Sequence, residues 1–482
     1  MYDLIVIGSG PAGEKGAAQA AYFGKKVAII EREPVLGGAS VNTGTIPSKT
    51  LRESALHLSG FRQRGFSEAM DVRMKSISVR DFMYRKELVV AHEWKRIDEN
   101  LRRHGIDRYQ GNARFLSPTQ VAVANALGEE VLEGQVVLIA TGSSPVRPPE
   151  VPFDGETVLD SDNMLTIDRI PESLAVVGAG VIGSEYASMF AALGVEVHLI
   201  DGRTSLLQNV DRELVRVLLG ELQNRLEIVL HLGCDVEAIH RVDGRVSLTM
   251  KDSTCFVVDK VLYAAGRCSN VEGLDLDKIG VKTGKRGLIE VDENYRTSVP
   301  NIYAAGDVIG FPALASTSME QARVAMVHAF DLKYKTKVAA ILPYAIYTIP
   351  EVATVGLSED DCRKSGQAFE VGRAYYRNNA RGQIIGDTKG LIKLVFDPES
   401  LALLGVHIIG ENASELLHVG MVVMQFGGTI NAFIDSVFNF PTLSEAYKYA
   451  AYDGLGNVAR RVNESDRRDH RGTPADSRQS VG

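Results

Sequence analysis

Residues 2–31 read YDLIVIGSGPAGEKGAAQAAYFGKKVAIIE, and this stretch decides the fold. The apolar run over Leu4–Ile7 predicts a strand that is buried on both faces. It is followed by a G-x-G-x-x-G turn, an alanine-rich segment that predicts a helix, and a second strand over residues 26–30. This order is typical of a dinucleotide-binding βαβ unit. A plain glycine-rich turn is the alternative interpretation of the glycines taken alone.

Each part of this unit has a physical role in binding a dinucleotide. The first glycine makes the turn, the second lets the backbone reach the pyrophosphate, and the third lets helix and strand pack closely. The N-terminus of the helix offers free N–H groups and a positive dipole end. An acid that closes the second strand accepts hydrogen bonds from ribose hydroxyls. In this chain these residues are Gly8, Gly10, Gly13 and Glu31.

The same unit returns at residues 173–201, which read SLAVVGAGVIGSEYASMFAALGVEVHLID. Its glycines are Gly178, Gly180 and Gly183, and Asp201 closes its second strand. In both units the acid lies 23 residues after the first glycine. Two units in one register imply two dinucleotides, or one cofactor and one dinucleotide substrate. The repeat therefore indicates a flavoprotein that meets a nicotinamide.

Composition excludes several classes of protein. The 482 residues are 45% hydrophobic and 24% charged, which is typical of a globular protein of about three domains. The net charge of -8 argues against nucleic acid as a partner. No two of the four cysteines have CxxC spacing, so we expect no metal site. Without a membrane-spanning stretch or a signal peptide, we expect a cytoplasmic protein.

Three further apolar strands end in polar turns, and the chain then changes character. The turns contain Thr141 and Gly142, Gly266 and Arg267, and Gly306 and Asp307. Asp307 is a candidate to hold the polyol of a flavin, although a purely structural turn is the alternative for each segment. Strands over 391–396 and 401–409 and a helix over 413–425 predict a separate α+β domain. Residues 456–482 are rich in charge, and we expect a disordered tail there.

Residues 37–53, GGASVNTGTIPSKTLRE, resemble the pyridine nucleotide–disulfide oxidoreductases, and the resemblance runs from Gly8 to about Gly454. The motifs ATGS, AGR, AAGD, YTIPEVATVG and PTLSE follow in the family's order. The resemblance implies FAD in the first unit, a nicotinamide nucleotide in the second, and a homodimer or larger homo-oligomer. The fold class is then α/β, with two Rossmann-like domains and a C-terminal α+β dimerisation domain. The expected boundaries are 1–150 and 273–340 for FAD, 151–272 for NAD(P) and 341–455 for dimerisation.

This chain departs from the family pattern at its redox groups. The two cysteine positions of the family are occupied by Ser40 and Thr45, whose hydroxyls form no disulfide. The position of the family's histidine base is occupied by Phe440, which cannot move a proton, although Glu445 remains. Both changes together indicate that the disulfide half-reaction is lost while the flavin half-reaction is kept. This combination resembles the soluble pyridine nucleotide transhydrogenases within the family.

The resemblance implies ping-pong hydride transfer from NADPH to NAD+ through flavin N5. Lys49 matches the family lysine near N5, and Glu185 matches the glutamate that pairs with it. Asp201 favours a free ribose 2′-hydroxyl and Arg203 a 2′-phosphate, which fits NAD(H) and NADP(H) as alternating substrates. A surface lysine, an ordinary helix glutamate and a solvated arginine are the alternatives.

Two other functions fit the same motifs. One is an NAD(P)H oxidase or quinone reductase, and the other is a nucleotide-binding protein without activity. The residues expected to contact FAD or a nucleotide are Gly8, Gly10, Gly13, Glu31, Gly37, Gly38, Ser40, Thr45, Lys49, Ala113, Thr141, Gly142, Gly178, Gly180, Gly183, Glu185, Asp201, Arg203, Gly266, Arg267, Gly306, Asp307 and Ala315.

Overall fold

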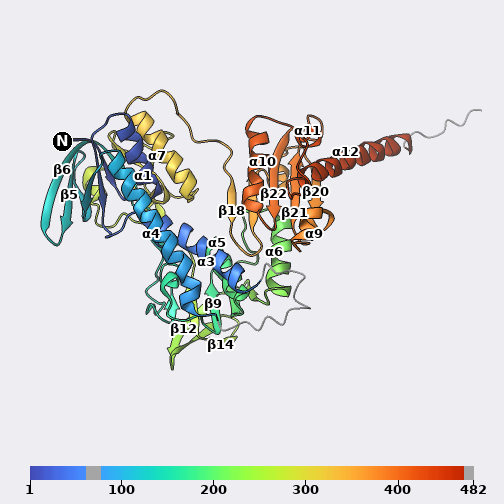
Figure 1. Ribbon diagram of the computed structural model, residues 1–482, viewed down its shortest axis with the longest axis horizontal. Coiled ribbons are helices and arrows are strands. Elements are labelled where there is room, and N and C mark those ends of the chain that lie inside the picture. The colour runs from blue at the N-terminus through green and yellow to red at the C-terminus, as the bar shows by residue number, and fades with distance from the viewer. Residues whose placement is uncertain (61–76, 472–482) are drawn as a thin grey trace, which may run out of the picture. The chain divides into compact units, whose positions relative to one another are not determined.

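The computed structural model describes residues 1–60 and 77–471 and separates into two compact units (Figure 1). The N-terminal unit holds residues 1–60, 77–205 and 227–340 of the described chain. The C-terminal unit holds residues 206–226 and 341–471. Within the described ranges, no helix is long and apolar enough to cross a membrane.

The first module of the N-terminal unit is built on a seven-stranded sheet with the order β3-β2-β1-β6-β5-β4, in which β17 also pairs with β6. Helices α1 (Pro11–Tyr22) and α7 (Ala315–Ala329) pack together on the core of this module. Because β1 is parallel to both β2 and β6 and its residues are nearly all buried, the apolar run predicted as a central strand is confirmed. The strands are β1 (Tyr2–Ile7), β2 (Val27–Glu31), β3 (Asp107–Gln110), β4 (Asn112–Ser117), β5 (Gln120–Asn125), β6 (Gly128–Ile139) and β17 (Ile302–Ala304).

Three helices follow β2 and lead out of this sheet. They are α2 (Gly38–Asn42), α3 (Thr45–Leu58) and α4 (Val79–Arg103), and α3 packs against α4. The long α4 begins at Ser78, whose hydroxyl accepts a hydrogen bond from the backbone N–H of Asp81.

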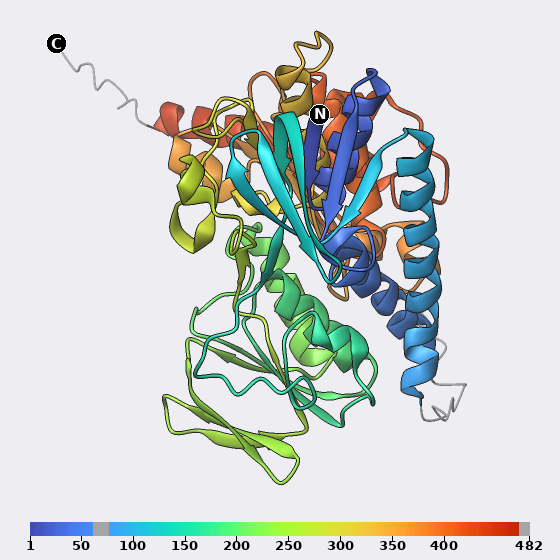
Figure 2. The same ribbon diagram turned by 90° about the vertical axis from the view of Figure 1, so that its left-hand side faces the viewer.

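The second module repeats the first in a smaller form. Its parallel sheet has the order β11-β10-β9-β15-β8, and α5 (Val181–Ala192) connects β9 to β10. A three-stranded antiparallel sheet packs against it around a shared apolar cluster. Figure 2 shows the blue and cyan sheet of the first module above the green second module. The strands are β8 (Val158–Leu159), β9 (Ser173–Val177), β10 (Glu196–Asp201), β11 (Val229–Leu232), β12 (Val236–Val242), β13 (Arg245–Met250), β14 (Cys255–Val258) and β15 (Lys260–Tyr263).

The C-terminal unit is an antiparallel sheet of five strands in the order β18-β19-β22-β21-β20, with helices packed on it. The α+β architecture expected here is therefore confirmed. The strands are β18 (Tyr344–Ile346), β19 (Val352–Gly356), β20 (Glu370–Tyr375), β21 (Leu391–Phe396) and β22 (Leu403–Ile409). The helices include α6 (Arg212–Asn224), α8 (Glu359–Ser365), α10 (Ala413–Gln425) and α12 (Ala446–Arg471).

Two expectations about the chain's organisation differ from the structure. The predicted disordered tail is wrong up to Arg471, because α12 continues through residues 456–471. Its early part is held by apolar packing of Leu455 and Val458 and by Asn457, whose amide donates to the carbonyl of Val371. Residues 472–482 lie outside the described residues. The second difference is α6, which the sequence places between β10 and β11 of the second module but which clusters with the C-terminal unit.

A buried ion cluster explains the position of α6. Lys393 on β21 is only 1% exposed, and its ammonium lies 2.8 Å from a carboxylate oxygen of Asp211, the N-cap of α6. The same ammonium contacts Glu213 of α6 at 3.0 Å and Glu359 of α8 at 2.7 Å. Arg373, which lies opposite Lys393 on β20, also binds Glu213, at 2.9 Å. The acidic residues in the first turns of two helices therefore bind two cations of the sheet. The positive N-terminal ends of the helix dipoles also favour acidic residues at these positions.

Replacing Lys393 is expected to destabilise the C-terminal unit. Lys393→Met leaves buried carboxylates without their shared cation, and such a loss costs about 3–5 kcal/mol. Hydrogen exchange followed by mass spectrometry should show faster exchange in β21 and β22, with β1 as the internal reference. Lys364→Met on the exposed face of α8 is the matched control. Unchanged exchange in β21 and β22 of the Lys393 variant would contradict this role.

The same cluster predicts loss of stability in acid. Burial alone would raise the pKa of Glu213, but hydrogen bonds from Arg373 and Lys393 outweigh it and lower the pKa. A carboxyl with a lowered pKa in the folded state stabilises the fold above its unfolded pKa of about 4, and this contribution disappears as pH falls further. After correction for the slower intrinsic amide exchange in acid, β21 and β22 should therefore lose protection below about pH 4, and lose more of it than in the Lys393→Met variant.

Candidate active site

The glycine turn of the first module brings backbone against backbone. Gly8 has φ of 102°, and a Cβ built on it would lie 2.4 Å from the carbonyl oxygen of Ala140. A Cβ on Gly13 would lie 1.8 Å from the carbonyl oxygen of Gly8. Neither position accepts a larger residue without moving the strand or the helix. The start of α1 is therefore held directly against the end of β1.

The remaining glycines keep space open in front of this turn. Gly10 is the N-cap of α1 and supplies no side-chain cap, so the N–H groups of the first helical turn point toward that space. A Cβ on Gly38, at the start of α2, would lie 2.8 Å from the Cα atom of Gly10. Gly37 has φ of 99° and donates its N–H to the hydroxyl of Ser9. A phosphate group fits such a cradle of free N–H groups.

Glu31 lies at the carboxyl end of β2, beside the turn. Its Oε2 accepts hydrogen bonds from the backbone N–H of Ser9 at 3.0 Å and from the Ser9 hydroxyl at 2.6 Å. Its Oε1 accepts from the backbone N–H of Glu33 at 3.0 Å. The acid predicted from the spacing is thus next to the glycines, and it also holds their turn.

Segments distant in the sequence complete the first site. Asp307 begins the short helix η4 (Asp307–Ile309) and accepts a hydrogen bond from the Ser143 hydroxyl at 2.8 Å. Gly306, with φ of 84°, donates its N–H to the amide oxygen of Gln321 on α7. Among the described residues, Thr141 Oγ1 is the only buried side-chain polar atom without a hydrogen-bond partner. A buried hydroxyl in that state needs an external partner, because leaving it unpaired is costly.

Two other predicted contacts of this module, Ala315 and Ala113, are both partly buried. Ala315 is the first residue of α7, which has no side-chain N-cap. Ala113 lies on β4, pairs with Val123 and packs against the sheet's core. The start of α7 therefore offers free N–H groups, and Ala113 is held in place by its pairing with β5 and by packing.

Helices α3 and α5 pack against each other and bring Lys49 to Glu185. The Lys49 ammonium donates to Glu185 Oε2 at 2.5 Å, with side chains 27% and 10% exposed. Lys49 is in the first turns of α3, and Glu185 is in the first turns of α5, directly after the second glycine turn. Thr45 opens α3 and is exposed, while Ser40 lies partly buried on α2. The predicted pair is therefore formed, and it joins the two modules.

The second glycine turn reproduces the first. A Cβ on Gly178, which has φ of 106°, would lie 2.6 Å from the Ala264 carbonyl oxygen. A Cβ on Gly183 would lie 1.8 Å from the Gly178 carbonyl oxygen, the same distance as in the first module. Gly180, the N-cap of α5, has no atom within 4 Å of its Cβ position. The approach to the start of α5 is therefore open.

Asp201 and Arg203 are joined to each other. Arg203 Nε donates to Asp201 Oδ1 at 2.8 Å, and Arg203 Nη2 donates to Oδ2 at 2.6 Å. Asp201 is 8% exposed and also accepts from the backbone N–H of Ala179 at 2.7 Å. Burial alone would raise the pKa of Asp201, but the hydrogen bonds from Arg203 and Ala179 outweigh it and lower the pKa. Arg203 is thus paired with Asp201, although its side chain is 46% exposed.

Arg267 links the modules rather than standing free. It begins β16 (Arg267–Ser269), which pairs with β7 (Ser143–Pro145). Its guanidinium donates to the hydroxyl of Ser143 at 2.8 Å and to the Ser143 carbonyl at 2.6 Å. Gly266 before it has φ of 130°. The Ser143 hydroxyl in turn donates to Asp307, so Arg267 positions a residue of the first site.

A family model for the pyridine nucleotide-disulphide oxidoreductases matches residues 2–329, and a model for the dimerisation domain of the same family matches residues 342–451. The chain belongs to the pyridine nucleotide-disulphide oxidoreductase family. It is accordingly a flavin-dependent oxidoreductase.

Relatives match over nearly the whole chain. A soluble pyridine nucleotide transhydrogenase from Mycobacterium bovis is 44% identical over 96% of this chain and 99% of its own length. A protein of the same name from Pseudomonas savastanoi is 39% identical over 95% and 99%. Among solved structures, an HOCl-induced flavoprotein disulfide reductase from Escherichia coli is 27% identical, with a TM-score of 0.84 over 94% and 99%. LpdA from Mycobacterium tuberculosis is 28% identical, with a TM-score of 0.85 over 93% and 99%.

Motif reasoning missed three residues that shape the sites of this family member. Ser9 and Ser143 each donate a hydrogen bond to a carboxylate, and although Ser143 ends the ATGS motif, the motif does not show that its hydroxyl binds Asp307. Asp162, before the short helix η1 (Asn163–Thr166), lies 3.9 Å from Arg267. Burial raises the pKa of Asp162 despite that cation. Its only signal in the sequence is an acid in a turn, which is too common to identify a site.

The position of the family's histidine lies in the C-terminal unit. Phe440 is 72% exposed there, and Glu445 accepts a hydrogen bond from the Tyr449 hydroxyl. An exposed phenyl ring has no proton to give, so no acid–base role follows for this position.

The two glycines of the second turn should respond differently to an added methyl group. Gly183→Ala forces β9 and α5 apart and should cost about 2–4 kcal/mol, which lowers the thermal unfolding midpoint by several degrees. Gly180→Ala meets no protein atom and should unfold as the parent does, but its methyl should weaken NADPH binding by at least about tenfold. Circular dichroism and NADPH titration measure the two effects. A Gly180→Ala protein that binds NADPH normally would disprove this assignment of the open approach.

Proposed function

We propose that the protein is an FAD-dependent NAD(P)+ transhydrogenase, which catalyses NADPH + NAD+ ⇌ NADP+ + NADH. The observation that carries the proposal is the Lys49–Glu185 pair, which joins two complete dinucleotide modules. Near this pair in the sequence, the two positions of the family's cysteines are Ser40 and Thr45, which carry no sulfur. The names of the two relatives at 44% and 39% identity support the same activity.

FAD fits the first module. The free N–H groups at the start of α1 would hold the pyrophosphate, and Glu31 would accept from the adenosine ribose. Asp307 has one carboxylate oxygen bound by Ser143 and would use the other for the polyol. The unpaired Thr141 hydroxyl would find its partner in the cofactor. When bound there, FAD would supply a group that can accept and donate a hydride.

Lys49 and Glu185 supply electrostatics and position. The Lys49 ammonium, whose direction is fixed by Glu185, would stabilise negative charge that develops on a bound cofactor during hydride transfer. Hydride transfer between two nicotinamides requires no proton from a side chain. The hydroxyls of Ser40 and Thr45 accept no electrons, so the chain offers no internal disulfide as an electron acceptor at these positions. This arrangement supports a ping-pong order in which one nucleotide leaves before the next one binds.

The Asp201–Arg203 pair suits a site that alternates between nucleotides. A ribose 2′-hydroxyl is held by the carboxylate, whereas a 2′-phosphate is held by the guanidinium. Each nucleotide therefore draws on one half of the pair. The match of residues 342–451 to a dimerisation domain supports a homodimer.

An anaerobic assay tests the activity. Protein reconstituted with FAD should reduce the thio analogue of NAD+ with NADPH, and it should not reduce lipoamide or glutathione disulfide, because it lacks the two sulfurs. Oxygen and a quinone serve as competing acceptors. Turnover with oxygen or quinone but none with the thio analogue would identify an oxidase or quinone reductase instead. Failure to retain FAD would refute the cofactor assignment.

Arg203→Ala should weaken NADP(H) selectively. The loss of a charge-assisted hydrogen bond to the 2′-phosphate is worth about 1.5–3 kcal/mol, or about ten- to a hundredfold in Kd. NAD(H) should bind nearly as before, because Asp201 keeps its hydrogen bonds from backbone N–H groups. Arg203→Lys keeps the charge but not the two-pronged geometry. Its loss of NADP(H) affinity should therefore be smaller than that of Arg203→Ala. Equal losses for both nucleotides would show that Arg203 is structural.

A further inference from the structure

A second ion pair lies over the same loop of the second module. Lys251 donates to Asp235 Oδ2 at 2.8 Å, and these side chains are 63% and 55% exposed. A Cβ built on Gly202 would lie 2.0 Å from Asp235 Oδ1. Gly202 is the residue between Asp201 and Arg203. The Asp235 carboxylate therefore lies beside Asp201 and Arg203, the pair proposed to bind the ribose.

Backbone hydrogen bonds fix this arrangement. The N–H of Gly233 donates to the carbonyls of both Asp201 and Arg203, at 2.9 Å each. The N–H of Lys251 donates to the Asp235 carbonyl at 3.0 Å. The loop after β10 and the loop after β11 are thus one hydrogen-bonded unit. Asp235 is held near Gly202 by main chain, so its position does not depend on a mobile side chain alone.

The four side chains form a neutral group of two carboxylates and two cations. In the free protein each cation is bound to its own carboxylate. A ribose 2′-phosphate adds about 1.5 to 2 negative charges, so both cations attract it and both acids repel it. The ribose 2′-hydroxyl of NAD(H) adds no charge, so its binding energy does not depend on the Asp235–Lys251 pair. Because Asp235 and Lys251 are exposed, exchanging their partners costs little.

We propose that Asp235 and Lys251 form a second specificity element, which sets the affinity of the second module for a ribose 2′-phosphate without affecting a 2′-hydroxyl. Lys251 attracts the phosphate, and Asp235 opposes it by repulsion and by competing for the lysine. The inference rests on the proposed function, in that the second module must accept both nucleotides. On this view the Asp235–Lys251 pair sets the balance between binding of NADP(H) and binding of NAD(H).

Calorimetric titration of the FAD-reconstituted protein with 2′,5′-ADP and with 5′-AMP tests this role. Lys251→Gln should weaken 2′,5′-ADP by about two- to fivefold, and Asp235→Asn should tighten it by about the same factor. Binding of 5′-AMP should be unchanged in both variants, which also shows that the module is folded. Lys278→Gln is the control, because it removes an exposed lysine paired with an aspartate on η2 (Leu276–Ile279), outside the module.

Opposite shifts for 2′,5′-ADP alone, reduced at 0.5 M salt, would establish the element. Shifts in the same direction, equal effects on 5′-AMP, or no effect in either variant would overturn it. Neither probe contains a nicotinamide, so the result is independent of hydride transfer. Absent transhydrogenation together with opposite shifts would reject the proposed function while keeping the 2′-phosphate site.

Discussion

Direct contact between the start of a helix and the end of a strand determines the geometry of both nucleotide modules. At Gly13 and at Gly183 the contact leaves no room for a single carbon atom, and the clash distance is the same in both. Each contact directs the free N–H groups of a helix toward the carboxyl edge of its sheet. Glu31 and Asp201 each accept a hydrogen bond from the residue that follows the first glycine. The acids that would bind ribose therefore also brace the turns.

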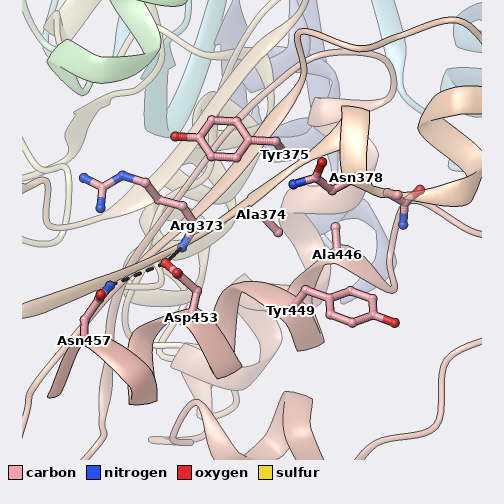
Figure 3. A pocket seen from close by; sticks show the side chains of 9 residues that line it. Arg373, Ala374, Tyr375, Asn378, Ala446, Tyr449, Asp453 and Asn457 are labelled. Carbon is pink, nitrogen blue, oxygen red and sulfur yellow. Dashed lines mark hydrogen bonds between the residues drawn. The ribbon is translucent and has the colours of Figure 1, made fainter. Parts of the chain in front are cut away.

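The two modules are coupled by side chains and by the short pairing of β7 with β16. The Lys49–Glu185 pair joins α3 to α5, and Arg267 reaches through Ser143 to Asp307. Both links end at residues that would contact the cofactor or its reaction partner. The C-terminal unit has its own organising group in Lys393, far more buried than a lysine usually is. Its pocket of about 490 Å³ between β20 and α12, lined by Tyr375, Asn378 and Tyr449, has no assigned ligand (Figure 3).

The sequence predicted both modules because their signals are local. Glycine spacing, apolar strands and a closing acid are all contained within 30 residues, and the structure places them at the edges expected. What it could not predict depends on contacts between distant segments. The attachment of α6 to the C-terminal unit follows from Asp211 meeting Lys393, which lie far apart in the chain. The pairing of Asp201 with Arg203 and the approach of Asp235 to Gly202 depend on side-chain direction, which spacing does not encode. The tail was misjudged because arginine and glutamate are good helix formers as well as solvated residues.

Hydroxyl groups at positions 40 and 45 change the chemical vulnerability of the enzyme as well as its reaction. A redox dithiol must be reactive, and the same reactivity exposes it to peroxide, to alkylating agents and to soft metal ions. Serine and threonine offer none of these reagents a target. Of the cysteines that remain, Cys362 is buried and none belongs to either nucleotide turn. Oxidants that attack a redox dithiol therefore meet no thiol at positions 40 and 45 of this chain.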